Sequence, residues 1–270
     1  MVKVFSLICI GFVLLLSCTR HPYAATNKSY KKQVKNYSKL LSEYPLKDSA
    51  GLFYAANWVG TTNFSLRRPN FVVIHHTAQN SCDQTLKTFT LPRTQVSAHY
   101  VICRDGIVYH MLHDQLRAHH AGVSKWGNAT DLNSSSIGIE IDNNGSEPFS
   151  DAQMNSLLQL LERLKKAFNI PQANFIGHAD VAPGRKVDPS RLFSWKQLAD
   201  KGFGYWYDTT SVNVPFDFNA LQALRVIGYN IARPEIAIQS YKIHWVPQDT
   251  AKVINETDKK ILMDLMKKYQ

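Results

Sequence analysis

Short runs of aliphatic and β-branched residues, separated by turn-forming residues, predict a β-sheet in the middle of the chain. The first run, Phe-Val-Val-Ile, ends at the adjacent His75 and His76. Asp105 and Gly106 separate two later runs and predict a hairpin turn between them. The runs together cover residues 71–74, 99–103, 107–112, 137–141 and 175–177.

Helical spacing of apolar residues follows the fourth of these runs. Apolar residues recur at every third or fourth position between Met154 and Phe168, behind Ser150 and Gln153, which have the pattern of a capping box. Three further helical patterns cover residues 219–226, 233–245 and 256–269. Mixed strands and helices predict an α/β or α+β layer fold, with a small three-helix domain at the C-terminus.

The N-terminus carries an apolar segment over residues 4–16, behind Lys3. It is too short to span a bilayer and has the length of a signal-peptide core. The sequence Leu-Leu-Ser-Cys that ends at Cys18 resembles the lipobox of bacterial lipoproteins, which implies a lipid anchor on Cys18. Because Thr19 and not Asp follows, the resemblance implies an outer-membrane lipoprotein that faces the periplasm. An ordinary secretory peptide with a chance cysteine is the alternative.

These patterns divide the chain into four predicted parts. Residues 1–17 form the signal peptide, and residues 18–49, rich in Lys, Ser, Asn and Tyr without a sustained apolar period, form a linker. Residues 50–207 contain the sheet and form the main domain, and residues 208–270 form the helical domain.

Composition and charge narrow the classes of protein further. The 270 residues are 44% hydrophobic and 19% charged, which is typical of a globular chain, and 31 Lys and Arg against 21 Asp and Glu give a net charge of +10. Such a charge favours anionic surroundings: nucleic acid, anionic lipid or an acidic polymer. A nucleic-acid partner is not expected, because no recognition motif is present. The common nucleotide-binding and serine-hydrolase motifs are also absent.

Five residues that can support hydrolysis each stand at a strand end or in the loop after one: His75, Glu140, His178, Lys186 and Asp188. Two histidines and one carboxylate provide three ligands for a tetrahedral zinc ion with an open fourth position. The ion would lower the pKa of a water from 15.7 to about 7. From spacing alone, hydrogen-bonded structural histidines are an equal alternative.

Strand alternation assigns roles to the two remaining residues. In residues 136–141, the isoleucines point to one face, and Gly138 and Glu140 point to the other. Glu140 can therefore face the site and transfer a proton. Lys186 stands two positions before Asp188, so its ammonium group can stabilise an oxyanion beside the site.

Four ordered blocks of sequence resemble the zinc-dependent N-acetylmuramoyl-L-alanine amidases, and within them the AmiD-type lipoprotein branch. The blocks are Val-Ile-His-His-Thr-Ala at 73–78, Ser-Ala-His-Tyr at 97–100, Ser-Ile-Gly-Ile-Glu at 136–140, and His-Ala-Asp-Val-Ala-Pro-Gly-Arg-Lys-Val-Asp-Pro at 178–189. The resemblance spans residues 57–207. It implies a mixed central sheet flanked by helices, peptidoglycan or muropeptides as substrate, and zinc as the cofactor.

The resemblance also implies a role for each site residue. His75, His178 and Asp188 correspond to the zinc ligands, and Glu140 and Lys186 to the catalytic pair. A non-catalytic peptidoglycan-binding protein and a zinc peptidase acting within the stem peptide are the alternatives. We expect a monomer.

Several residues outside this set receive weaker predictions. The block at 118–122 resembles an Ala-Trp-His-Ala-Gly block of the AmiD-type enzymes, with His119 in place of Trp, which suggests His120 as a substrate contact. Trp126 is a second candidate for the cleft wall; for both residues, packing is the alternative. His76 is expected to be structural, because it points away from its neighbour His75.

The C-terminal domain and the cysteines leave further alternatives open. Residues 208–270 resemble the peptidoglycan-binding domain appended to such amidases, or else form a helical cap. Cys82 and Cys103 either form a disulfide, which the exported compartment would allow, or remain two thiols.

Overall fold

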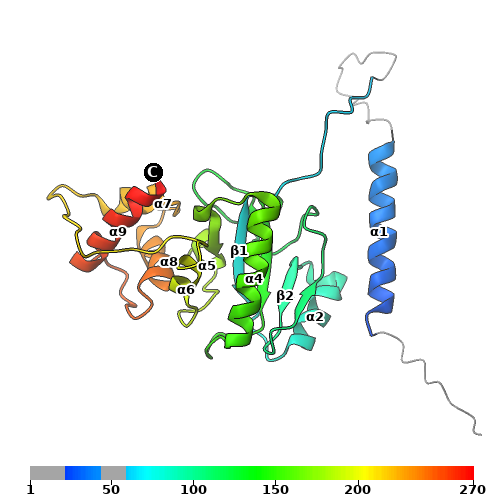
Figure 1. The fold of residues 1–270 in the computed structure, drawn as a ribbon, viewed down its shortest axis with the longest axis horizontal. Coiled ribbons are helices and arrows are strands. Elements are labelled where there is room, and N and C mark those ends of the chain that lie inside the picture. Colours follow the sequence, from blue (N-terminus) through cyan, green and yellow to red (C-terminus); the bar gives the residue numbers. More distant parts are fainter. Residues whose placement is uncertain (1–21, 44–58) are drawn as a thin grey trace, which may run out of the picture. The chain divides into compact units, whose positions relative to one another are not determined.

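The computed structural model describes residues 22–43 and 59–270, so the predicted signal peptide and Cys18 lie outside the described residues. The chain divides into two compact units, Met1–Asn63 and Phe64–Gln270 (Figure 1). The described helix of the first unit is α1 (Ala24–Ser42). Among the described residues, no helix is both long and apolar enough to cross a membrane.

The second unit is built on a five-stranded mixed sheet in the order β3-β2-β4-β1-β5. Parallel pairs join β1 to β4, β1 to β5 and β2 to β4, whereas β2 and β3 form the predicted antiparallel hairpin. The strands are β1 (Phe71–His76), β2 (Tyr100–Ile102), β3 (Val108–His110), β4 (Ser136–Ile141) and β5 (Phe175–Gly177). Each of the five apolar runs in the sequence therefore forms a strand.

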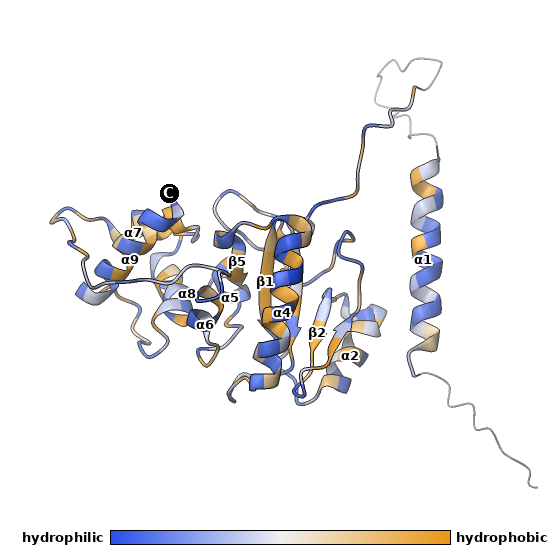
Figure 2. Cartoon of the chain, viewed as in Figure 1, coloured by the Kyte–Doolittle hydropathy of each residue, from blue (hydrophilic) through white to orange (hydrophobic). Residues whose placement is uncertain are grey.

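One face of the sheet is covered by α4 (Asp151–Phe168) (Figure 1). Ser150 and Gln153 form the predicted capping box at its start, and Asn169 ends it in the left-handed conformation. The apolar stripe of the helix, from Met154 to Leu164, packs in one cluster with the isoleucines of β4. In Figure 2, β1 is mostly hydrophobic, whereas α4 shows hydrophobic and hydrophilic residues in turn.

The opposite face of the sheet packs against the C-terminal helices α7 (Ala220–Ile227), α8 (Pro234–Trp245) and α9 (Glu256–Tyr269). Val73 of β1 and Ile176 of β5 share one hydrophobic cluster with Leu224, Trp245 and Leu262. The three predicted helices are thus present, but they share a core with the sheet instead of forming a separate one.

Short helices connect these layers. They are α2 (Cys82–Thr90), α3 (Leu132–Ser135), α5 (His178–Val181) and α6 (Trp195–Ala199), with single 3₁₀ turns at Pro92–Thr94 and Gln172–Asn174.

Part of the predicted linker is helical. The 19 residues of α1 include no Pro and no Gly, and five lysines favour a solvated helix. None of its residues is buried. The linker prediction therefore missed a helix, because the few apolar residues that share one side of α1 stand among many polar ones and none of them is buried.

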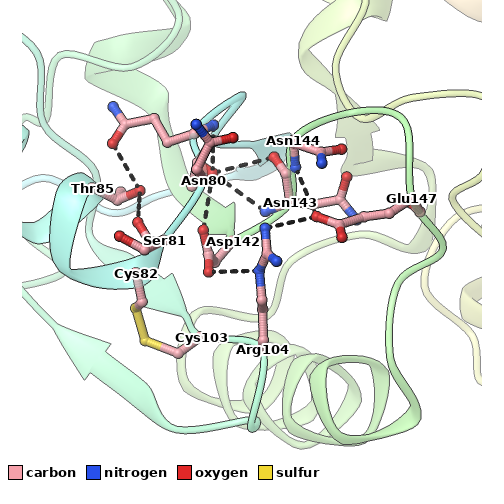
Figure 3. Close-up of polar contacts among 12 residues, drawn as sticks. Asn80, Ser81, Cys82, Thr85, Cys103, Arg104, Asp142, Asn143, Asn144 and Glu147 are labelled. Carbon is pink, nitrogen blue, oxygen red and sulfur yellow. Dashed lines mark hydrogen bonds and ion pairs between the residues drawn. A yellow bond between two sulfur atoms is a disulfide. The ribbon is translucent and has the colours of Figure 1, made fainter.

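A disulfide joins Cys82 at the start of α2 to Cys103 at the end of β2, with their Cα atoms 5.3 Å apart. Beside it, Arg104 pairs with Asp142 at 3.1 Å and with Glu147 at 2.7 Å (Figure 3). The bridge therefore ties α2 to the sheet near the end of β4.

Candidate metal and catalytic site

The structure brings three of the predicted site residues together. His75 lies near the end of β1, His178 begins α5 directly after β5, and Asp188 lies in the loop that follows. His75 Nδ1 lies 2.9 Å from His178 Nδ1, and Asp188 Oδ2 lies 3.0 Å from each of these two nitrogens. All three residues are buried. Two imidazole nitrogens and a carboxylate oxygen that converge in this way can hold a divalent metal ion.

Hydrogen bonds to the outer nitrogen, Nε2, of His75 and His178 leave Nδ1 of each ring free to face the candidate metal position. His178 Nε2 lies 3.2 Å from the carbonyl oxygen of Ala121, to which it can only donate. His75 Nε2 lies 3.0 Å from Nδ1 of His120. The outer partners therefore place the proton of each ring on Nε2 and direct the lone pair of Nδ1 toward the group.

His120 extends this chain of hydrogen bonds. Its Nε2 lies 3.1 Å from the hydroxyl of Ser136, which in turn donates to the carbonyl of Leu132. Both ring nitrogens are thus engaged inside the protein, and the residue is only 9% exposed. This arrangement agrees with the packing alternative for His120, whereas substrate contact by His120 stays a prediction.

Glu140 enters the site from β4, where it is the register neighbour of His75 on β1. Its Oε2 atom is buried and receives no hydrogen bond from any described residue. Burial, and next the negative charge of Asp188, raise the pKa of Glu140 to about 8, whereas Lys186 opposes this rise. A carboxyl group with such a pKa can both accept and release a proton near neutral pH.

Lys186 and Asp188 lie on the loop after α5. Burial raises the pKa of Asp188, but its close contacts with the His178 and His75 rings outweigh burial and hold this pKa well below its usual range. Burial, followed by the proximity of His178, lowers the pKa of His75 to about 4. The site therefore favours an ionised aspartate beside a neutral imidazole, which is the protonation that metal coordination needs.

Two further predicted residues lie away from this group. Trp126 is 7% exposed and packs edge-on against Tyr229 in the core shared with the C-terminal helices, which agrees with the packing alternative; its place on a cleft wall stays a prediction. His76 points to the other face of the sheet and accepts a hydrogen bond from the Ser190 backbone. This arrangement agrees with the structural role predicted for His76.

The sequence did not identify the residues that hold the candidate metal ligands in position. Ser136, Ala121 and Asp180 contact the histidines or the segment that carries them. All three stand inside the family-like blocks at 118–122, 136–140 and 178–189, but the blocks assign them no role. The one available signal is Gly138, because a Cβ atom there would lie 2.4 Å from Cγ of His120.

Comparison with known proteins extends these observations. Residues 65–191 match the N-acetylmuramoyl-L-alanine amidase family. The chain is 34% identical to N-acetylmuramoyl-L-alanine amidase AmiD of Escherichia coli over 213 residues, which cover 67% of this chain and 76% of that protein. It is 38% identical to 1,6-anhydro-N-acetylmuramyl-L-alanine amidase AmpD of Haemophilus influenzae over 104 residues, 38% of this chain and 56% of that protein.

Solved structures show the same fold. AmiD of Escherichia coli, in complex with the substrate anhydro-N-acetylmuramic acid-L-Ala-D-gamma-Glu-L-Lys, matches with a TM-score of 0.68 and 29% identity, covering 78% of this chain and 93% of that chain. AMPDH3 of Pseudomonas aeruginosa also matches with a TM-score of 0.68, at 28% identity, covering 81% and 99%. The sequence blocks, the sheet and these relatives agree: the chain belongs to the N-acetylmuramoyl-L-alanine amidase family.

Proposed function

We propose that this protein hydrolyses the amide bond between N-acetylmuramic acid and L-alanine in peptidoglycan or muropeptides. The observation that supports this most directly is the buried group of His75, His178 and Asp188, with the Glu140 carboxyl beside it. The relative AmiD, which spans most of this chain, has the same activity in its name.

Zinc is the metal that these ligands would hold. Two neutral imidazoles and one carboxylate match the ligand set of a catalytic zinc site with one open position. When bound, the ion supplies Lewis-acid polarisation of the substrate carbonyl and a more acidic water.

Glu140 and Lys186 supply the proton transfer and the charge stabilisation. The Glu140 carboxylate accepts a proton from the attacking water and returns it to the leaving nitrogen of L-alanine, so the carboxylate is regenerated in each cycle. The Lys186 ammonium stabilises the negative charge that develops on the carbonyl oxygen as water adds to the carbonyl carbon, before the C–N bond breaks. Burial strengthens both interactions, because water screens them less.

The test is product identification with a matched pair of variants. Glu140→Gln keeps the shape of the side chain but cannot accept the proton, so we expect turnover to fall by about a hundredfold or more, with zinc content near that of wild type. Glu162→Gln, an exposed position on α4, is the control and should retain full rate. Mass spectrometry of digested muropeptides should show intact stem peptides. Shortened peptides would indicate a zinc peptidase, and no product a binding protein.

We also propose that Cys18 carries a lipid that anchors the protein to the outer membrane, facing the periplasm. The support is the lipobox-like sequence before Cys18 and the absence of Asp after it. Mass spectrometry of the N-terminal peptide from membrane fractions tests this, with Cys18→Ser as the comparison. Recovery of an unmodified Cys18 would contradict the anchor.

We further propose that the C-terminal unit binds peptidoglycan. An open groove of about 600 Å³ lies between α7, α8 and the loop before α9, with Phe216, Ile238, Val253 and the cations Lys252 and Lys259 around it. Phe216→Ser and Lys259→Gln should weaken binding to purified sacculi, while cleavage of soluble fragments is retained. Unchanged sacculus binding by both variants would favour a helical cap.

A further inference from the structure

The helix α1 has two chemically different faces. Tyr30, Val34, Tyr37 and Leu41 follow one another at intervals of four, three and four residues, and so lie in one row along the helix. Their side chains have no buried environment: Val34 is 39% exposed, Tyr37 49% and Leu41 79%. The apolar row therefore lies on the surface of a helix that buries none of its own residues.

The other side of α1 is strongly positive. At 100° per residue, all five lysines lie between about 90° and 190° from the apolar row. They are Lys28, Lys31, Lys32, Lys35 and Lys39. No Asp or Glu lies within the helix, so no acidic residue of α1 neutralises this face.

We propose that α1 is a membrane-binding element that lies flat on an anionic phospholipid bilayer. In this position the apolar row enters the boundary between headgroups and acyl chains, and the lysines reach the anionic headgroups. An acidic wall polymer would match the lysines but offers no apolar phase for the row. The bilayer is therefore the partner that satisfies both faces.

The position of α1 in the chain agrees with this role. Cys18, the proposed lipid site, stands six residues before Ala24, so an anchored chain would hold α1 at the surface. A lipid on Cys18 would hold the chain at the bilayer, and α1 would add apolar and charged contacts along the same surface. The contact of α1 with lipid does not itself require the acyl chain.

The test compares vesicles of phosphatidylcholine alone with vesicles that also contain phosphatidylglycerol, using the full chain. Binding to each is measured by co-sedimentation, so that contributions common to both vesicle types cancel in the ratio. Replacing the five lysines of α1 with Gln should lower the preference for anionic vesicles by about tenfold or more, because each lysine near such a surface contributes about 1 kcal/mol. Replacing Val34 and Leu41 with Ser should weaken binding to anionic vesicles without reducing the charge.

The matched control replaces an equal number of exposed lysines on the second unit with Gln. These are Lys87, Lys125, Lys166, Lys201 and Lys260. This control should keep most of the preference for anionic vesicles. An equal loss in the control would show that the net charge of the whole protein is responsible and would overturn the proposal. So would an unchanged preference in the α1 variant, or a loss of binding to sacculi instead of vesicles.

A second, independent observation concerns Asp180, two residues after His178. Asp180 is 1% exposed and accepts three hydrogen bonds at 2.7 Å each. One comes from the backbone of Gly177, at the start of α5, and the others come from Tyr229 and His244 of the C-terminal helical region. The buried Asp180 carboxylate thus joins α5, which carries His178, to the C-terminal helical region.

The two donors are themselves held firmly. The His244 ring stacks on Trp195 with 3.9 Å between ring centres and on Trp245 with 4.3 Å. Trp245 Nε1 also donates to the Tyr229 hydroxyl at 3.1 Å. Neither Tyr229 nor His244 can shift without disturbing this aromatic cluster.

We infer that His244 and Tyr229 are positioning residues for His178. Since α5 has only four residues, it has little stability of its own, and its orientation depends on what holds Gly177 and Asp180. This inference rests on the proposed zinc site. Support of this kind behind a ligand typically changes metal affinity by 10- to 100-fold.

The test measures zinc affinity by competition with a chelator, and the melting temperature of the metal-free protein, for Tyr229→Phe and His244→Ala. Tyr241→Phe is the control, because it also removes a buried phenol hydroxyl that bonds an aspartate, Asp258, on the same helical unit. We expect zinc affinity to fall about tenfold in the first two variants and to stay unchanged in the control. His244→Gln, which retains a donor, should recover part of the affinity.

The two measurements separate positioning from general stability. If Tyr229→Phe and His244→Ala lower the melting temperature while zinc affinity stays within twofold of wild type, the inference is overturned. If His244→Ala does not fold, Tyr229→Phe alone decides. Failure of the wild-type protein to bind zinc would instead contradict the proposed zinc site.

Discussion

Gly138 leaves the space that the His120 ring occupies. Its register neighbour on β1 is Val73, and His120 packs directly over it. A Cβ atom at this position would lie 2.4 Å from Cγ of His120, closer than any ordinary contact. His120 hydrogen-bonds to His75. A side chain at position 138 would therefore displace His120 and, through it, disturb the candidate metal ligand His75.

The replacement Gly138→Ala should therefore destabilise the protein by about 1–3 kcal/mol, the usual range for overpacking a filled core. Urea unfolding measures this cost. In a His120→Ala background the obstructing ring is gone, so the same replacement should cost much less. Equal costs in the two backgrounds would mean that His120 is not what Gly138 accommodates.

His99 gives the fold a pH dependence of known sign. Burial, ahead of the nearby positive charge of Arg67, lowers its pKa to about 4, while a hydrogen bond to Leu116 opposes the shift. The unfolded chain has the ordinary value near 6.5, so it binds the proton more readily than the folded chain. The contribution of His99 to stability is full above pH 6.5 and is lost as the pH falls toward 4.

The expected loss is about 3 kcal/mol over this window, from the size of the shift. The measurement is urea unfolding of the metal-free protein at several pH values. In His99→Asn, the side-chain oxygen can still accept the Gly138 backbone hydrogen bond but does not titrate. This variant should lose less stability on acidification than wild type. Parallel curves for the two proteins would contradict the assignment.

At the scale of elements, the Cys82–Cys103 disulfide is the link that most constrains the unfolded chain. It closes a loop with a sequence separation of 21 residues, which in the chain-entropy account stabilises by about 3 kcal/mol. The double variant Cys82→Ala/Cys103→Ala should lose about this much in urea unfolding. Wild type under reducing conditions should match it. Alkylation of both thiols without prior reduction would show that the bridge is absent.

The elements also show where sequence patterns succeed. The runs that became β1 and β4 and the capped helix α4 were predictable, because burial on one side imposes a period that a single sequence displays. The helix α1 was not, because it buries nothing. For the same reason, the four-residue helix α5 has no pattern of its own and takes its shape from the contacts around Asp180.

At the scale of the whole molecule, the shared core changes what a truncation can reveal. Leu224, Trp245 and Leu262 of the C-terminal helices pack in one cluster with Val73 and Ile176 of the sheet. Deleting residues 218–270 would expose this face of the sheet to water. We therefore expect the truncated protein to be insoluble or to lose its cooperative thermal transition, and not to survive as a free catalytic domain.

Calorimetry and limited proteolysis of the truncated protein check this expectation. A sharp transition near that of the full chain would show that the helices after residue 207 are dispensable for folding. Point substitutions such as Phe216→Ser avoid the problem, because Phe216 is fully exposed and does not belong to the shared core.

The sequence by itself determined the strands, the main helices and the identity of the chemical groups at the site. Strand alternation placed Glu140 opposite the isoleucines of β4, and the family-like blocks named His75, His178 and Asp188. These features are local, because a period or a motif is contained in a short stretch of chain.

Tertiary structure alone decided the roles of His120, Trp126, Asp180 and His244. Each has a partner between 13 and 103 positions away, for example Asn133, which accepts from the His120 backbone, and Tyr229, which packs against Trp126. Whether a histidine contacts substrate or supports a metal ligand depends on what packs against it. The surroundings of a buried histidine form only when distant segments pack together and exclude water, so a local sequence pattern does not predict them.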